Sequence, residues 1–168
     1  MGNKEITKTI LEQLDALLEP EGFKKKGLTF FQDHGDVVHL IGMQKSLGST
    51  DREIKVTTNL GVWIRALAPI RAGKPDPPRL SDAHWRQRIG TLLPERTDKW
   101  WSADSPANAK TVSISIVEAL SKYGLPALHN LGTTDALIQL WHTGACPGLT
   151  AFQRDKYLQQ LRNVKAQV

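Results

Sequence analysis

Five side chains suited to anion recognition lie in two short segments of the chain, and they are Trp63, Arg65, His84, Arg86 and Arg88. A guanidinium presents planar, charged hydrogen-bond donors to carboxylates and phosphates, and an indole presents a flat face for stacking. If the two segments pair in one sheet, strand alternation places all five on the face opposite Leu60, Val62 and Ile89. This pattern predicts a cationic sheet face that binds an acidic protein surface or a small anion.

A second interpretation of the same arginines requires no ligand. Their guanidiniums could pair with Asp82, Glu95 or Asp98 and lie over tryptophan rings, so that they only cover the sheet. The candidate site also includes Asp98, Trp100 and Trp101, which follow the second segment. Because adjacent indoles in an extended chain cannot face the same core, we expect one of the two to be exposed. It would form either a lip of the binding surface or a plug between the sheet and a helix.

The segment that ends at residue 65 has the alternation of a half-buried strand. Its core-facing positions are predicted to be Val56, Thr58, Leu60, Val62 and Ile64. Residues 36–45 are apolar on both faces for most of their length, which is typical of a central strand. Together with residues 28–32 and 84–90, these segments predict an antiparallel meander of about four strands.

The helical spacing of apolar residues predicts one helix before the sheet and three after it. The first covers residues 4–19. The second begins near Pro106 and ends at Gly124-Leu-Pro126, which is a strong stop signal. A short third helix precedes Gly144, and a capping-box spacing at residues 150–153 opens the last one.

These elements predict an α+β fold with an N-terminal helix, an antiparallel sheet and three C-terminal helices packed on one face. We expect a single domain over residues 1–168, with the N-terminal helix and sheet at about 4–93 and a helical half at about 103–165. Residues 68–82 contain several prolines, and they are expected to form an extended segment on the surface.

The composition is that of an ordinary globular protein. A hydrophobic content of 40% and a charged content of 23% argue against disorder, and a net charge of +5 is too mild to require a nucleic-acid partner. The single cysteine, Cys146, excludes an intramolecular disulfide and suits a reducing compartment. No run of apolar residues approaches the length of a transmembrane helix. We therefore expect a cytoplasmic protein with no membrane partner.

The chain lacks the short motifs of cofactor, metal and catalytic sites, such as a Gly-rich phosphate loop, a nucleophile elbow or His-Glu-x-x-His. We therefore predict no cofactor, no metal site and no catalytic residue. Two alternatives to protein or anion binding stay open. The face could stack single-stranded nucleic acid on its tryptophan and arginines, or it could belong to an enzyme with His84 as acid or base and the arginines as a substrate clamp.

Several short motifs in a fixed order resemble the bacterial DUF4304 family. They include Gly22-Phe-Lys-Lys-Lys-Gly27, Asn59-Leu-Gly-Val62, His84-Trp-Arg-Gln-Arg-Ile-Gly90 and Asp98-Lys-Trp-Trp101. The resemblance covers roughly residues 5–125. It implies a small cytoplasmic bacterial α+β domain, and it carries over no catalytic residues because the family has no assigned function.

The leading hypothesis from the sequence is a non-enzymatic binding module that uses the basic sheet face. One concrete version is an immunity-type partner of a secreted toxin, since small cofactor-free bacterial proteins often do such work. Nucleic acid is a less favoured partner because the excess of basic residues is mild.

Overall fold

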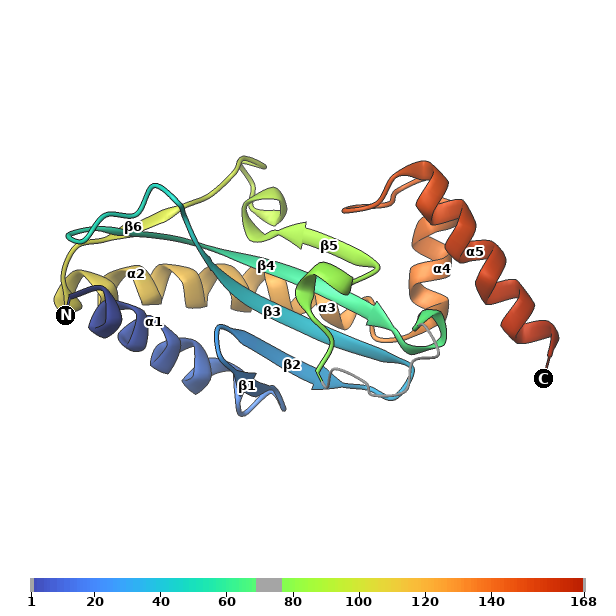
Figure 1. Cartoon of the computed structure of the whole chain (residues 1–168), viewed down its shortest axis with the longest axis horizontal. Helices are drawn as coiled ribbons and strands as arrows, with labels where there is room; N and C mark the ends of the chain where they lie inside the picture. Colours follow the sequence, from blue (N-terminus) through green and yellow to red (C-terminus); the bar gives the residue numbers. More distant parts are fainter. Residues whose placement is uncertain (1, 69–76, 168) are drawn as a thin grey trace.

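The structure is a computed structural model that describes residues 2–68 and 77–167. Its fold is α+β, as predicted: an open antiparallel sheet carries the N-terminal helix and the long central helix on one of its faces (Figure 1). We call the opposite face the open face. It carries Val38, Leu40, Asn59, Gly61 and Trp63, which alternate with the core-facing residues of the two central strands.

Within the described residues the sheet has six strands, with the order β1-β2-β3-β4-β5 and with β6 paired to the start of β4. Their bounds are β1 Lys24–Lys26, β2 Thr29–Asp33, β3 Val37–Lys45, β4 Ile54–Ile64, β5 Trp85–Arg88 and β6 Trp101–Ala103. The prediction of about four strands missed β1 and β6. Each has only three residues, which is too short for alternation to be seen, and the three lysines of β1 are all exposed, as in a solvated turn.

The helices are α1 Gly2–Leu18, α2 Pro106–Ala119, α3 Leu125–His129, α4 Thr134–His142 and α5 Ala151–Ala166. Three short 3₁₀ turns join the strands, and they are η1 Arg65–Leu67, η2 Leu80–Asp82 and η3 Ile89–Leu92. The strand predicted for residues 84–90 is therefore shorter than expected and ends in a 3₁₀ turn. Of the predicted surface segment 68–82, residues 69–76 lie outside the described residues.

The prediction that Gly124-Leu-Pro126 ends the central helix is wrong. A π-helical turn, η4 Leu120–Gly124, joins α2 to α3, so that the helical path continues to His129. Proline lacks an N–H and clashes with the preceding turn of a regular α-helix, and the wider π turn accommodates it. Gly124 serves packing here, since a Cβ would lie 3.0 Å from the Leu120 side chain and 3.3 Å from that of Ile89.

The main core lies between the sheet and the helices. The largest fully buried side chains include Phe30, Ile41, Leu60, Ile89 and Trp141. A second, smaller cluster lies on the open face and consists of Val38, Leu40 and Ala83 with the partly buried Phe31, Trp63 and Leu80. This cluster holds η2 against the sheet.

The close approach of η2 depends on a glycine in β4. A Cβ at Gly61 would lie 2.9 Å from both the Ala83 and the Leu80 side chains. Only a residue without a side chain leaves room for η2 at this distance.

α4 and α5 lie past one end of the sheet, where α5 runs next to η1 (Figure 1). The loop between α4 and α5 returns to the sheet, and the backbone N–H of Arg86 donates to the Pro147 carbonyl at 3.1 Å. α5 also contacts the sheet through Tyr157, whose ring meets that of His84 edge-on at 5.0 Å between centroids. Within residues 2–68 and 77–167, no helix is long and apolar enough to cross a membrane.

Candidate functional site

β4 and β5 pair in one antiparallel sheet, as the sequence pattern predicted. Asn59 lies opposite Arg88, and Gly61 lies opposite Arg86. Both arginines therefore project from the open face together with Asn59.

Arg88 is held by a network rather than left free. Its Nη1 donates to both carboxylate oxygens of Asp98 at 2.9 Å, and its guanidinium lies 5.2 Å from the ring centroid of Trp100. The hydrogen bond from Arg88 lowers the pKa of Asp98, and a second one from the Trp100 indole N–H at 2.9 Å acts in the same direction. This arrangement matches the second interpretation, in which the arginine pairs with a carboxylate of the protein, lies over a tryptophan ring and only covers the sheet.

Arg65 is held in the same way at the other end of the open face. It donates to the Asp33 carboxylate at 2.8 Å and to the Gly35 carbonyl at 2.6 Å, and it lies 5.5 Å from the Trp63 ring centroid. The pKa of Asp33 is lowered mainly by the Gly35 backbone N–H, with Arg65 as a further cause. Arg65 and Arg88 thus belong to separate clusters.

His84 is a buried structural residue. Its Nδ1 accepts a hydrogen bond from the Ile64 backbone N–H at 2.9 Å, and burial lowers its pKa to about 4. The imidazole is neutral at pH 7, and Tyr157 packs over it. His84 therefore does not take part in the exposed cationic surface that the sequence predicted.

The two adjacent tryptophans diverge. Trp100 is partly exposed and lies beside Arg88, whereas Trp101 is buried in the main core and donates its indole N–H to the Ser115 hydroxyl at 2.9 Å. Of the two indoles, only that of Trp100 lies beside Arg88.

A hollow of about 390 Å³ lies on the open face, and we call it the open-face hollow. Its lining comes from β3, β4, β5, η2 and the loop between α4 and α5, and consists of Gln44, Asn59, Leu80, Ser81, Arg86, Gln87, Arg88 and Gly148. The structure thus brings Arg86 and Arg88 together at one cavity, whereas Trp63, Arg65, His84, Asp98, Trp100 and Trp101 do not line it.

Hydrogen bonds inside this hollow engage the oxygens of two of its three carboxamides, those of Gln44 and Asn59. The Gln44 Oε1 accepts from the Asn59 amide at 2.8 Å and from Arg88 Nη2 at 3.4 Å. The Asn59 Oδ1 accepts from Arg88 Nε at 3.3 Å. Since a carboxamide nitrogen only donates, the lining is left rich in N–H donors.

Of the two arginines that line the hollow, Arg86 has more N–H groups that make no hydrogen bond among the described residues. It is exposed, and its Nη2 donates to the Gly148 carbonyl at 3.0 Å. None of the ion pairs formed within the described ranges includes Arg86. Its charge is therefore available to a ligand in the hollow.

Six of the eight lining residues were not predicted from the sequence, and they are Gln44, Asn59, Leu80, Ser81, Gln87 and Gly148. A signal for the first two was present, because strand alternation places both on the same face as the arginines. Gly148 is brought in by a loop far along the chain, and no local pattern indicates it. A Cβ there would lie 2.7 Å from the Arg86 side chain, so a glycine is needed for the contact.

Across the part of the chain that the structure describes, no three His, Cys, Asp or Glu side chains gather in a way that could hold a metal ion. Two histidines lie close together, with a ring nitrogen of His34 3.1 Å from one of His39.

The fold and the site define an α+β domain with an open antiparallel sheet and a donor-rich hollow on its open face. The family model described as a domain of unknown function, DUF4304, matches residues 14–130, and the chain belongs to this family. The comparisons with curated proteins and with solved structures found no match. The matched range contains Gln44, Asn59, Arg86 and Arg88, whereas Gly148 lies in the segment that follows it.

Proposed function

We propose that this protein is a non-enzymatic binding module whose open-face hollow binds a carboxylate of an acidic protein partner. The observation that carries the proposal is an exposed guanidinium, Arg86, that lines the hollow beside the Gln44 and Asn59 amides and has no carboxylate partner among the described residues. Charge-assisted hydrogen bonds from arginine to carboxylate are among the stronger polar contacts that proteins make.

The network around Arg88 supports this proposal because it fixes the donors in place. Arg88 orients the amide oxygens of Gln44 and Asn59 toward itself, so that their N–H groups are directed elsewhere. Asp98 balances the charge of Arg88 from outside the lining. Arg86 is thus the uncompensated charge of a pre-organised site, and a carboxylate would neutralise it.

Binding is favoured over catalysis by what the lining contains. It includes no His, Cys, Asp, Glu or Lys, so the described part of the hollow offers no side chain for general acid or base work near neutral pH. His84, the acid or base of the enzyme alternative, is buried behind Tyr157.

The packing of the tryptophan rings favours a protein carboxylate over single-stranded nucleic acid as the ligand. Base stacking needs open aromatic faces. Trp63 packs in the cluster with Leu80, and the Trp100 ring already has Arg88 over it.

The proposal is tested by an NMR titration of the protein with a hexaglutamate peptide at low salt. We expect shifts of the Arg86 Nε–H and of the Gln44 and Asn59 side-chain amides. Arg86→Gln should weaken binding about tenfold, as the loss of a charge-assisted hydrogen bond does. Arg162→Gln, at an exposed position near the end of α5, removes the same charge and should leave the affinity unchanged.

Two results contradict the proposal. One is the absence of shifts at these three residues while the protein stays folded. The other is equal binding of the peptide by Arg86→Gln and the unmodified protein. A labelled oligothymidine run in parallel distinguishes the nucleic-acid alternative, which predicts tighter binding of the oligonucleotide and a steep loss with salt.

A further inference from the structure

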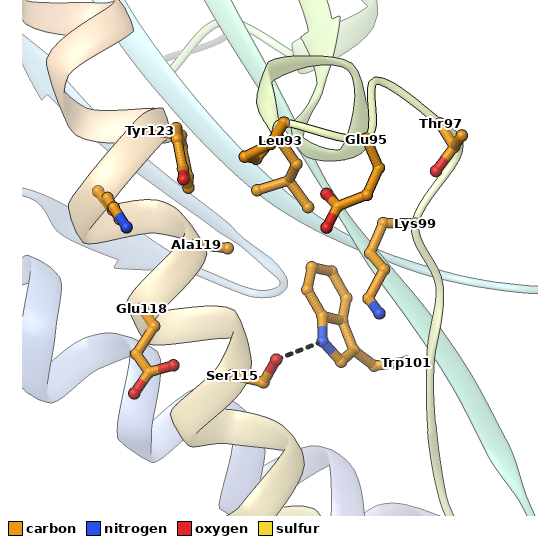
Figure 2. A pocket seen from close by; sticks show the side chains of 11 residues that line it. Leu93, Glu95, Thr97, Lys99, Trp101, Ser115, Glu118, Ala119 and Tyr123 are labelled. Carbon is orange, nitrogen blue, oxygen red and sulfur yellow. Dashed lines mark hydrogen bonds between the residues drawn. The ribbon is translucent and has the colours of Figure 1, made fainter.

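A second hollow, of about 420 Å³, lies between the segment that follows η3 and the junction of α2 with the π-helical turn η4 (Figure 2). We call it the helix-side hollow. It shares no lining residue with the open-face hollow, and its volume is in the range of small-molecule sites.

The centre of this hollow is apolar and aromatic. Figure 2 shows Leu93, Ala119 and Tyr123 around the space above the Trp101 ring. Trp101 is 6% exposed and its indole N–H is already bonded to Ser115, so it presents a small apolar part of its ring to the hollow. An apolar and aromatic lining of this kind suits the apolar part of a ligand.

One wall carries charges of both signs. Glu95 and Lys99 extend from the segment after η3, and Figure 2 shows the Glu95 carboxylate directed toward the space above Trp101. Both side chains are exposed, and neither forms an ion pair within residues 2–68 and 77–167. Lys99 instead lies 5.6 Å from the Trp101 ring centroid.

The opposite wall also carries one charge of each sign, although Figure 2 shows the Glu118 carboxylate directed away from the space above Trp101. Glu118 and Lys122 come from α2 and η4, and Lys122 lies 5.6 Å from the Tyr123 ring centroid. Four charged groups, two of each sign, thus line one small cavity without pairing with one another, as far as the described residues show. A simple anion or a simple cation would satisfy only one sign, whereas a zwitterion satisfies both.

The wall that carries Glu95 and Lys99 is held in an unusual conformation. Arg96, between them, has φ of 50°, which is uncommon for a residue other than glycine. The segment is fixed from behind, because the Thr57 hydroxyl donates to the Lys99 carbonyl at 2.7 Å. Irregular backbone that is fixed in this way is found at ligand sites, as are π-helical turns such as the one on the opposite wall.

From these observations we infer that the helix-side hollow binds a free α-amino acid with an aromatic side chain. The ligand's ammonium group pairs with Glu95, and its carboxylate pairs with Lys99 and draws that side chain away from the Trp101 ring. The ligand's ring then packs between Leu93, Ala119 and the part of Trp101 that Lys99 leaves. The two charges of the ligand lie close together on one carbon, as Glu95 and Lys99 lie on one wall.

The test uses L-phenylalanine and two analogues that each lack one charge, 3-phenylpropionate and phenethylamine. Titrations followed at the Trp101 indole N–H signal should show millimolar binding of L-phenylalanine and at least about tenfold weaker binding of either analogue. D-glucose, which carries no charge and no aromatic ring, serves as the blank.

Two variants assign the charges. Glu95→Gln should weaken L-phenylalanine about tenfold and leave 3-phenylpropionate unchanged, and Lys99→Met should weaken L-phenylalanine and leave phenethylamine unchanged. Both positions are exposed, so the variants should fold, and Glu5→Gln and Lys110→Met are matched controls at exposed positions outside the hollow. No shift of the Trp101 signal with L-phenylalanine up to about 10 mM overturns the inference, as does equal binding of the three compounds.

Discussion

The two hollows of this molecule use charge in different ways. In the open-face hollow, the side chains bond to one another. Arg88 donates to Asp98, Asn59 and Gln44, whereas the Arg86 side chain donates only to the Gly148 carbonyl and has no ion-pair partner among the described residues. In the helix-side hollow, charges of both signs line one cavity, and none of them forms an ion pair among the described residues. The difference teaches that the number of charged residues in a site says little about the ligand, whereas the pairing among them indicates which charge is available.

Lowering the pH is expected to change the free energy of unfolding more than any substitution below, because acid protonates two buried histidines, His84 and His39. Burial lowers the pKa of His84 and of His39 to about 4, while unfolded histidine titrates near 6.5. The unfolded chain therefore binds more protons in this interval, and stability is full above about pH 6.5 and falls toward pH 4. We expect each histidine to contribute a loss of up to about 3 kcal/mol, measured by denaturant unfolding across this range.

The same acid titration distinguishes the two hollows. A protonated His84 cannot accept from the Ile64 N–H, so the contact with Tyr157 on α5 should loosen first. NMR signals of Arg86 and Gly148 should then change before that of Trp101. His84→Gln should flatten part of the pH dependence, and an unchanged slope in this variant contradicts the assignment.

Gly90→Ala is expected to break the helix-side hollow alone. A Cβ at Gly90 would lie 2.1 Å from the Thr97 carbonyl oxygen and 2.5 Å from the Lys99 nitrogen, and both are backbone atoms that cannot move aside cheaply. We expect a loss of about 3 kcal/mol in the free energy of unfolding and displacement of the Glu95 wall.

Gly61→Ala is the matched variant on the open face. Its Cβ would meet the side chains of Ala83 and Leu80 rather than backbone, so the loss should be smaller, about 1–2 kcal/mol. It should perturb hexaglutamate binding and leave the Trp101 signal in place. Equal losses for the two glycine variants would show that the contacts behind the two hollows are equally tolerant.

Arg88→Met and Arg86→Met are expected to change stability least, and they test whether Arg88 is bonded within the protein while Arg86 is available to a ligand. Arg88→Met removes the contacts to Asp98, Asn59 and Gln44, and the pKa of Asp98 should return toward its ordinary value. Arg86→Met should change the free energy of unfolding by less than about 0.5 kcal/mol. Carboxyl titration by NMR and denaturant unfolding measure both, and a larger stability loss for Arg86→Met would assign it a structural role.

Much of the fold follows from periodicity in the sequence. The alternation of residues 54–65 and the apolar run of 36–45 correctly predicted the two central strands, and the capping box at Thr150 correctly placed the last helix. The stop signal at Gly124-Leu-Pro126 failed because a π turn absorbs the proline, which no local pattern shows.

The candidate site could be predicted only as far as strand alternation reaches. Alternation placed Arg86 and Arg88 on one face, but the partners that decide their availability come from elsewhere in the fold. Asp98 and Gly148 lie on loops, and the burial of His84 depends on α5, which packs through Tyr157. These are tertiary contacts between segments far apart in the chain, and the order of residues within a strand carries no trace of them.

The most direct test of the central claim is the ratio of hexaglutamate affinities of the unmodified protein and Arg86→Gln at low salt. An available Arg86 in a donor-rich hollow predicts about tenfold weaker binding by the variant, with Arg162→Gln unchanged. A ratio near one for Arg86→Gln, with both proteins folded and binding the peptide, would contradict the account.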